Sequence, residues 1–300
     1  MKNEEIGNRA QRRLFFILNS QFLISKIAFA LYLLALPIYC LLRLAGESEW
    51  QRVLTFAIPC LLCLTGFTHA VEHQGWRRAL FLFGSGAVIS LSAEALGSST
   101  GFLFGSYSYT EKLGYKLFGL VPWLIPIAWC SMLYPAWHVA KGVGQEAWGV
   151  KRVRSTLHAL RLTPYALRIT TAALAITAWD LSLDPRMVQD GYWVWQQGGP
   201  YFGIPISNYV GWFVTALVIF GVWSIGRIDH SHSPHSMVNR QWPMVNLPML
   251  AYLVVWLGES MANAVFWAGP RVGLSVFVGM GVFALPVLVH LTKRRDLAVD

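Results

Sequence analysis

The chain has 300 residues, of which 55% are hydrophobic and 13% charged, and its formal net charge is +9. So few charged residues exclude an ordinary soluble protein and predict an α-helical protein that crosses a membrane several times. In a soluble domain the basic excess would point to nucleic acid. Beside a bilayer, basic cytoplasmic loops and anionic lipid head groups account for it, so membrane lipid is an expected partner and nucleic acid is not.

Eight apolar stretches have roughly the 20 residues needed to cross the hydrocarbon core. We therefore predict an all-α fold, a polytopic transmembrane bundle in which residues 1–300 form a single integral-membrane domain. The basic residues before the first stretch are not followed by a small-residue cleavage site, so a retained helix is expected there and not a signal peptide. The predicted spans are about 24–44, 53–71, 78–97, 118–139, 163–183, 206–226, 246–267 and 272–291.

Basic residues are distributed unevenly between the two sides of this predicted bundle. With the N-terminus inside, 18 of the 24 Lys and Arg residues fall in inner segments. Because basic loops are retained in the cytoplasm, the asymmetry predicts that both termini are cytoplasmic. The outer segments hold Arg43, Arg52, Lys112, Lys116, Arg186 and Arg271.

The stretch Trp179–Trp212 leaves the fifth apolar run through two acids and returns to the membrane after an aromatic, Gly-rich loop. Asp180 and Asp184 are four residues apart, so on one helix both carboxyl groups project from the same face. A second loop, Gly97–Phe118, has a similar composition. Because Tyr and Trp favour the membrane interface, we expect both loops on the outer side, where they would cap a cavity.

Four acids lie in or at the edge of predicted spans. Asp180 and Asp184 end the fifth span, Glu94 ends the third, and Glu259 lies in the outer half of the seventh. Ionisable groups at this depth are expensive to bury and are generally functional. A carboxyl group that burial keeps protonated can deliver a proton. The structural alternative is hydrogen bonding between helices, or pairing with a buried arginine such as Arg168.

Many aromatic residues accompany these acids in the sequence. Ring faces stabilise cations, so an acid beside an aromatic, apolar cavity suits the protonation of an olefin to a carbocation. The alternative is that the rings anchor the chain at the membrane interface. The rings concerned are Tyr107, Tyr109, Trp123, Trp129, Trp179, Tyr192, Trp193, Trp195, Tyr201, Phe202 and Trp212.

Metal chemistry is the main competitor. Membrane di-iron oxygenases hold iron with histidines at helix ends, and such histidines are His69, His73, His138, His230, His232 and His235. Asp180 and Asp184 are also spaced as in an acidic motif of membrane prenyltransferases, which use Mg²⁺, but no second Asp-rich motif is present. Cys60 and Cys63 have the spacing of a zinc or redox pair, yet they stand alone in a span, which favours packing. We therefore expect no metal and no cofactor.

Four motifs follow one another along about residues 60–265. They are Glu94…Thr100-Gly101-x-x-Phe104-Gly105-x-Tyr107-x-Tyr109, Pro122-x-x-Ile125-Pro126-x-x-Trp129, Trp179-Asp180-Leu-x-x-Asp184-Pro185 and Tyr201-Phe202-Gly203-Ile204-Pro205-x-x-Asn208-x-x-Gly211-Trp212. In this order they resemble the membrane carotenoid 1,2-hydratase family, which includes bacterial γ-carotene 1′-hydroxylases and bisanhydrobacterioruberin hydratases of halophilic archaea. Halophilic proteins carry acidic surfaces, so the charge of +9 favours a bacterial cytoplasmic membrane.

The resemblance implies a cofactor-independent hydro-lyase of carotenoid biosynthesis. It would add water to the terminal isopropylidene double bond of an acyclic carotene ψ-end, of the γ-carotene or lycopene type. From the chemistry we expect Asp180 to donate the proton and Glu94 or Asp184 to hold or activate the water. The residues expected to bind substrate are Tyr107, Tyr109, Trp123, Trp129, Trp179, Tyr201, Asn208, Trp212 and Glu259.

The expected partners are the carotenoid, lipid and other enzymes of the same pathway. Two alternatives remain open at this point. One is an oxygen-dependent di-iron carotenoid hydroxylase. The other, from a different class, is a non-catalytic carotenoid-binding membrane protein, in which buried acids facing a polyene would be costly without benefit.

Overall fold

A computed structural model of the chain describes residues 2–46, 48–146, 158–228 and 247–296. Within these ranges the chain forms eight α-helices and four short β-strands, which confirms the predicted all-α fold. Residue contacts divide the chain into two compact units, Met1–Gly84 and Ser85–Asp300. The single integral-membrane domain stays a prediction.

The first unit contains α1 (Lys2–Ala45), α2 (Glu49–Gln74) and the first turns of α3 (Trp76–Thr100). Helices α1 and α2 pack against each other, and the hydroxyl groups of Tyr39 and Thr55 lie 3.2 Å apart between them. Ser48 caps the start of α2 by accepting a hydrogen bond from the Gln51 N–H. Gly75, with φ of +84°, ends the helix in a backbone conformation that glycine adopts readily.

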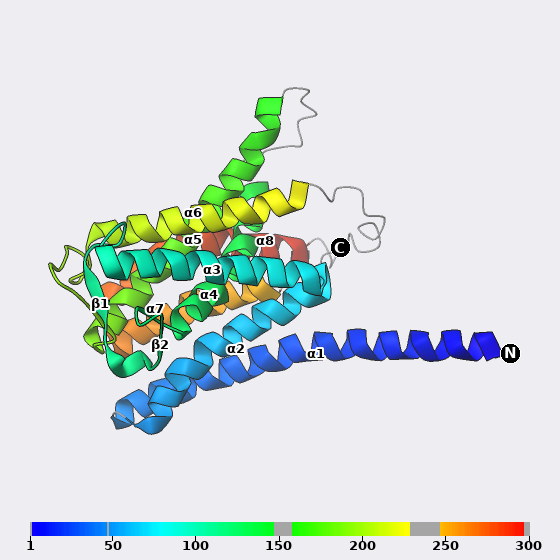
Figure 1. The fold of residues 1–300 in the computed structure, drawn as a ribbon, viewed down its shortest axis with the longest axis horizontal. Helices are drawn as coiled ribbons and strands as arrows, with labels where there is room; N and C mark the ends of the chain where they lie inside the picture. Colours follow the sequence, from blue (N-terminus) through cyan, green and yellow to red (C-terminus); the bar gives the residue numbers. More distant parts are fainter. Residues whose placement is uncertain (1, 47, 147–157, 229–246, 297–300) are drawn as a thin grey trace. The chain divides into compact units, whose positions relative to one another are not determined.

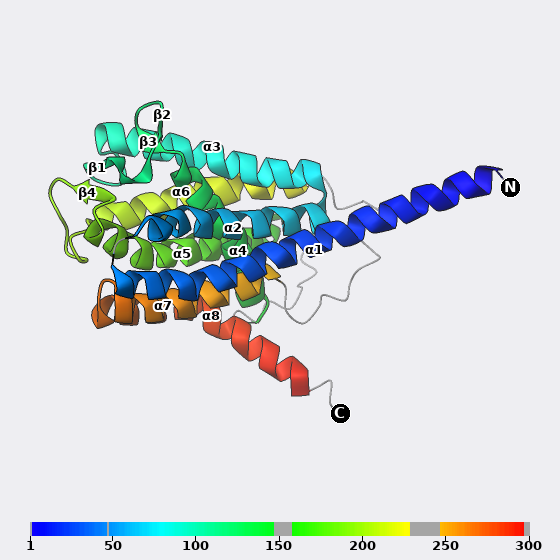
Figure 2. The same ribbon diagram turned by 90° about the horizontal axis from the view of Figure 1, so that it is seen from below.

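The second unit contains the rest of α3, then α4 (Leu124–Glu146), α5 (His158–Gln189), α6 (Ile206–Ile228), α7 (Leu247–Phe266) and α8 (Pro270–Asp296). Helices α4 and α5 occupy its middle: α4 packs on α5, α7 and α8, and α5 packs also on α6. Figure 2 shows both between α6 and the α7–α8 pair. Every residue from Trp129 to Ala140 is buried, so the core of this unit follows α4.

Six helices in the described ranges are long and apolar enough to cross a membrane. The other two are the central α4 and α5, each of which packs against several neighbouring helices. Helix α8 shows the pattern expected of a lipid-facing helix, because exposed apolar residues recur every three or four positions, at Leu274, Val278, Val282, Leu285 and Val289. The chain is therefore a multi-pass membrane protein.

Two predicted helix ends move outward. Helix α5 continues to Gln189 and α3 to Thr100, so Asp180, Asp184 and Glu94 lie within helices and not at their ends. The prediction ended each helix where the apolar residues stop. In α5 the chain stays helical beyond that point with protein around it, since Asp184, Pro185 and Met187 are buried.

The loops before α4 and after α5 pair with each other, as Figure 1 shows near the label of β1. Strand β1 (Tyr107–Tyr109) is antiparallel to β4 (Trp193–Trp195), with Tyr107 opposite Trp195 and Tyr109 opposite Trp193. Because side chains alternate along a strand, these four rings share one face, while Val194 on the other face is half exposed. We call the two loops, residues 101–123 and 190–205, the cap.

The cap also contains the 3₁₀ turn Glu111–Leu113 and the hairpin of β2 (Lys116–Leu117) with β3 (Val121–Pro122). Phe104 anchors the cap to the helices. A Cβ atom added at Gly97 in α3 or Gly211 in α6 would lie 2.5 Å or 2.7 Å from its ring, so only glycine leaves room. The two loops are joined further by Lys112 Nζ, which donates to the Asp190 carbonyl at 2.6 Å.

Candidate functional site

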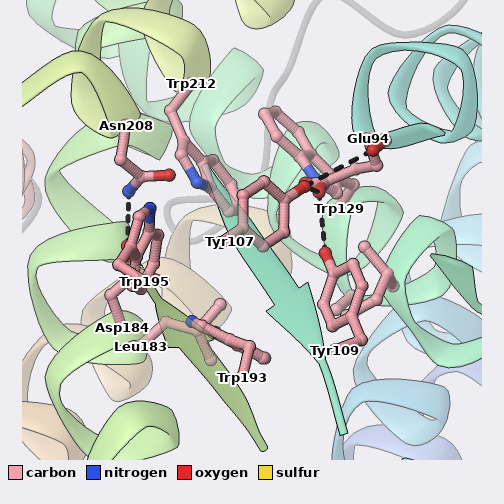
Figure 3. A pocket seen from close by; sticks show the side chains of 12 residues that line it. Glu94, Tyr107, Tyr109, Trp129, Leu183, Asp184, Trp193, Trp195, Asn208 and Trp212 are labelled. Carbon is pink, nitrogen blue, oxygen red and sulfur yellow. Dashed lines mark hydrogen bonds between the residues drawn. The ribbon is translucent and has the colours of Figure 1, made fainter. Parts of the chain in front are cut away.

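A cavity lies between the cap and helices α3 to α6, within the second unit (Figure 3). The space open to water-sized molecules is ≈ 30 Å³. That is enough for about one or two waters. The lining residues are Glu94, Tyr107, Tyr109, Ile125, Ala128, Trp129, Leu183, Asp184, Trp193, Trp195, Asn208 and Trp212.

Glu94 lies on one side of this cavity, where three hydrogen bonds hold it (Figure 3). Its Oε1 accepts from Trp129 Nε1 at 2.9 Å, and its Oε2 accepts from the hydroxyl of Tyr109 at 2.7 Å and from that of Tyr107. Burial raises the pKa of Tyr107 and of Tyr109, so both hydroxyls keep the proton that they donate. A side chain that accepts three bonds and donates none suits an ionised carboxylate.

Asp180 and Asp184 lie on the opposite side, one helical turn apart on α5, as the spacing predicted. The amide nitrogen of Asn208, in the first turn of α6, donates to Asp180 Oδ2 at 2.8 Å and to Asp184 Oδ2. The two carboxyl groups also lie within hydrogen-bonding reach of each other, and no donor among the described residues reaches the buried Asp180 Oδ1. Two carboxyl groups can bond to each other only when one carries a proton, so this pair is built to share one.

Aromatic rings form most of the remaining wall. Trp129 and Trp212 stack with centroids 3.7 Å apart, and Trp179 packs its edge on Trp212 at 5.9 Å. Tyr107 leans on Trp195 at 5.6 Å across the β1–β4 ladder. The cavity is thus apolar and aromatic between its two acidic sides, an environment that favours a transient cation.

The predicted site residues fall into three groups. Seven line the cavity: Glu94, Asp184, Tyr107, Tyr109, Trp129, Asn208 and Trp212. Two lie directly behind the wall, Asp180 against Asn208 and Trp179 against Trp212. Trp123, Tyr201 and Glu259 are not part of the lining.

Glu259 belongs to a separate polar cluster between α5 and α7. It accepts from Ser182 Oγ at 2.8 Å and pairs with Arg186 Nη1 at 3.5 Å, while Asn263 donates to Ser182 Oγ at 2.9 Å. Ser182 and Arg186 are each two residues beyond one of the paired aspartates, which places them on the opposite face of α5. This cluster therefore joins α5 to α7 and does not face the cavity.

Five lining residues were not among the predicted site residues: Ile125, Ala128, Leu183, Trp193 and Trp195. A pattern in the sequence indicates how the two tryptophans are oriented. Tyr-x-Tyr in one loop and Trp-x-Trp in the other have the period of a strand, which turns alternate rings to one face. Trp193 also forms a side-chain hydrogen bond with Asp184, so it links the cap to the acid pair.

The structure describes three of the six histidines on which the metal hypothesis rests. In α2 the rings of His69 and His73 stack at 4.0 Å, and in α4 His138 Nδ1 lies 2.9 Å from the Tyr134 carbonyl. Among the described residues no three His, Cys, Asp or Glu side chains gather in a way that could hold a metal ion. His230, His232 and His235 lie outside the described residues.

Comparisons with known proteins agree with this picture. A family model described as "Carotenoid biosynthesis protein" matches residues 50–285. The chain is also similar to the bisanhydrobacterioruberin hydratase of Haloarcula japonica, with 24% identity over 208 residues. The match covers 69% of this chain and 63% of the relative, so the chain spans less than two thirds of that protein's length. No solved structure matches.

Proposed function

The chain belongs to the carotenoid biosynthesis protein family, and from this premise we propose that it is a hydratase that adds water to the terminal isopropylidene double bond of an acyclic carotene ψ-end. The relative named as a hydratase supports this reaction class. The observation that carries the proposal is a pair of buried aspartates, Asp180 and Asp184, that the Asn208 amide bridges beside an aromatic cavity with room for water.

The proposed reaction begins at Asp184, because this member of the pair lines the cavity. Its proton goes to C2 of the olefin, the π electrons form the new C–H bond, and a tertiary cation remains at C1. A water molecule then forms the C1–O bond, and the proton that it releases returns to the charged aspartate pair. The pair ends as it began, and the sum of the steps is the addition of one water.

Glu94 has a different proposed role. Its oxygens already accept three hydrogen bonds, so it is a poor base but a well-fixed negative charge facing the developing cation. The outer face of the Trp129–Trp212 stack adds cation–π stabilisation, of about 2 kcal/mol in a dry site. Because both effects act on the cation and not on the neutral olefin, they lower the barrier to protonation.

Product analysis tests the proposed function against its two rivals. The chain would be expressed in a bacterium that makes lycopene or γ-carotene, and the carotenoids would be identified by mass. A gain of one water per modified end supports the hydratase. A gain of one oxygen atom would instead establish the di-iron hydroxylase, and unmodified carotene bound to the purified protein would establish the carrier.

We also place the cap, and with it the cavity, on the outer side of the membrane, since basic residues concentrate on the other side. Val194 in the cap and Arg77 in the first turn of α3 are both exposed. In intact cells an impermeant thiol reagent should label Val194→Cys and spare Arg77→Cys, with the wild-type chain measuring the background of its own four cysteines. Labelling of Arg77→Cys alone would move the site to the cytoplasmic side.

A further inference from the structure

Helix α5 lacks one of its own hydrogen bonds in the turn that carries the aspartate pair. Pro185 lies inside this helix, which continues to Gln189. Proline has no N–H, so it cannot donate to the carbonyl four residues earlier, which belongs to Leu181. The hydroxyl of Tyr201 donates to this carbonyl at 3.0 Å. A residue of the cap thus supplies the bond that the helix cannot make.

The cap presents Tyr201 on a tight turn. The Ile204 N–H donates to the Tyr201 carbonyl at 2.9 Å, and the two residues between them have positive φ angles, +51° at Phe202 and +87° at Gly203. These angles are those of a type I′ turn, in which a left-handed Phe is an unfavourable conformation that the surrounding loop has to hold. A Cβ atom added at Gly199 would lie 2.2 Å from Ile204, so the loop closes tightly around this turn.

The hydroxyl of Tyr201 is suited to a lasting role as donor. Burial raises the pKa of Tyr201 to about 12, so the hydroxyl keeps its proton throughout the physiological range. The ring packs edge-on against Phe202 and Tyr209, with centroids 4.8 Å and 5.5 Å away. Tyr201 is not part of the cavity lining, and its hydroxyl contacts the helix that carries the aspartate pair.

We infer that Tyr201 is a positioning residue: by completing the hydrogen bonding of α5 at Leu181, it fixes the helical turn from which Asp180 and Asp184 project. Leu181 directly follows Asp180, and its carbonyl lies within the turn that separates the two acids. The cap and the acid pair are therefore held in one geometry. The kinetic consequence rests on the proposed hydratase function, whereas the hydrogen bond and its effect on stability do not.

The chain supplies a matched control on the same helix. The hydroxyl of Tyr252 donates to the Ala175 carbonyl, also at 3.0 Å. Four residues after Ala175 stands Trp179, whose N–H is present, so that carbonyl keeps its helical bond without the tyrosine. The two tyrosines therefore differ in whether the carbonyl has another donor, and Tyr201 also forms a side-chain hydrogen bond with Ser275 in α8.

The test combines Tyr201→Phe, Tyr252→Phe, Pro185→Ala and the double variant Tyr201→Phe with Pro185→Ala, all in the full-length protein. Tyr201→Phe removes the side-chain donor to a carbonyl that no N–H at position 185 can bond, so the turn that carries the acids should loosen, and kcat should fall about tenfold while KM stays nearly unchanged. Tyr252→Phe should stay within about twofold of the wild type. Alanine at position 185 restores the helical N–H, so Tyr201→Phe should cost less than about twofold in the Pro185→Ala background.

Two kinetic results would overturn the inference. One is a loss from Tyr201→Phe that is equally large with and without Pro185→Ala, because the hydroxyl would then act elsewhere than at Leu181. The other is a rise in KM at unchanged kcat, which would make Tyr201 a direct substrate contact, as the sequence predicted. Thermal melting of the four variants gives the same comparison without substrate. If the wild type hydrates no carotene, the proposed function fails, and the melting series alone decides the role of Tyr201.

Discussion

Two acidic sites face one cavity, and their hydrogen bonding differs in a way that separates their roles. Glu94 accepts bonds at both oxygens, from Trp129, Tyr107 and Tyr109, all three of them neutral donors. The aspartate pair shares the amide of Asn208, Trp193 adds a bond to Asp184, and no donor among the described residues reaches Asp180 Oδ1. A saturated carboxylate holds a charge in place, whereas an under-supplied pair must retain a proton to bond to itself.

In the proposed mechanism the two sites act on different steps. A donor that loses its proton to an olefin leaves a negative pair and a positive carbon, and the cation has to survive until water reaches it. A fixed charge across the cavity and aromatic faces between the two sides would stabilise the cation until water attacks it. The variants below test this division of labour.

The largest effect is expected at the donor. Asp184→Asn and Asp180→Asn keep size and polarity but remove the shared proton, so hydration should fall by ~10²–10⁴-fold, the contribution of a general acid. Folding should survive, because a neutral amide is cheaper to bury than a carboxylate. Turnover would be measured in purified protein with a lycopene-type substrate.

The matched control for these variants is Glu72→Gln in α2, the same chemical change outside the cavity. It should retain wild-type turnover. If both aspartate variants accumulate normally and hydrate at the wild-type rate, the pair is not the acid, and Glu94 becomes the next candidate.

A smaller loss is expected at Glu94. Glu94→Gln removes the fixed charge and replaces one carboxylate oxygen by an amide N–H₂, which then faces either Trp129 or the two tyrosine hydroxyls that donate to that oxygen, so turnover should fall roughly 10²-fold. The proton donor is intact, so the product should be unchanged. A loss as large as that of Asp184→Asn would erase the distinction between the two sites, and normal turnover would remove Glu94 from the mechanism.

The aromatic wall should contribute less again. Trp212→Leu removes one face of the Trp129 stack, and a cation–π contribution of about 1–2 kcal/mol corresponds to roughly a 5- to 30-fold drop in kcat. The control is Trp123→Leu, because Trp123 does not line the cavity. Equal losses from the two variants would show that the rings act through packing and not through the cation.

The smallest catalytic effect is expected in the polar cluster on the far face of α5. Glu259→Gln should change turnover less than about threefold, since a substitution away from the cavity leaves the reacting groups in place and acts mainly on stability. The melting temperature should fall, because Arg186 loses the carboxylate that neutralises it. A large loss of turnover without loss of stability would return Glu259 to the site, where the sequence analysis had placed it.

The periodicity of the apolar residues was enough to predict the helices. The cost of burying a charge was enough to select most of the acids that lie at the cavity. Asp180 and Asp184 were recognised as sharing a face because an interval of four is one helical turn, and the Asn208 amide indeed reaches both. The sequence could not show which of the two acids lies nearer to the cavity. Only the tertiary arrangement shows that Asp184 lines the cavity and Asp180 lies behind it.

The contacts made by the cap could not be read from local pattern. The pairing of β1 with β4 joins residues more than 80 positions apart, and its register decides which rings face inward. Tyr201 and Trp123 are aromatic residues of the cap, like several of the lining residues. Their orientation, however, depends on the turn or hairpin that carries them. Glu259 was assigned to the site by depth alone, whereas the rotation of α5 places its partner Ser182 on the opposite face.

The central claim is that a protein-held proton and a water molecule add across one double bond, and isotopic labelling of the product tests it most directly. The purified protein would convert an acyclic carotene anaerobically, in the presence of a chelator, in heavy water that carries ¹⁸O. The account predicts one deuterium at C2 and one ¹⁸O at C1 of the same end group, because the aspartate pair exchanges its proton with solvent before each turnover. Oxygen that comes from molecular oxygen instead, or a hydroxylated product without deuterium at C2, would contradict it.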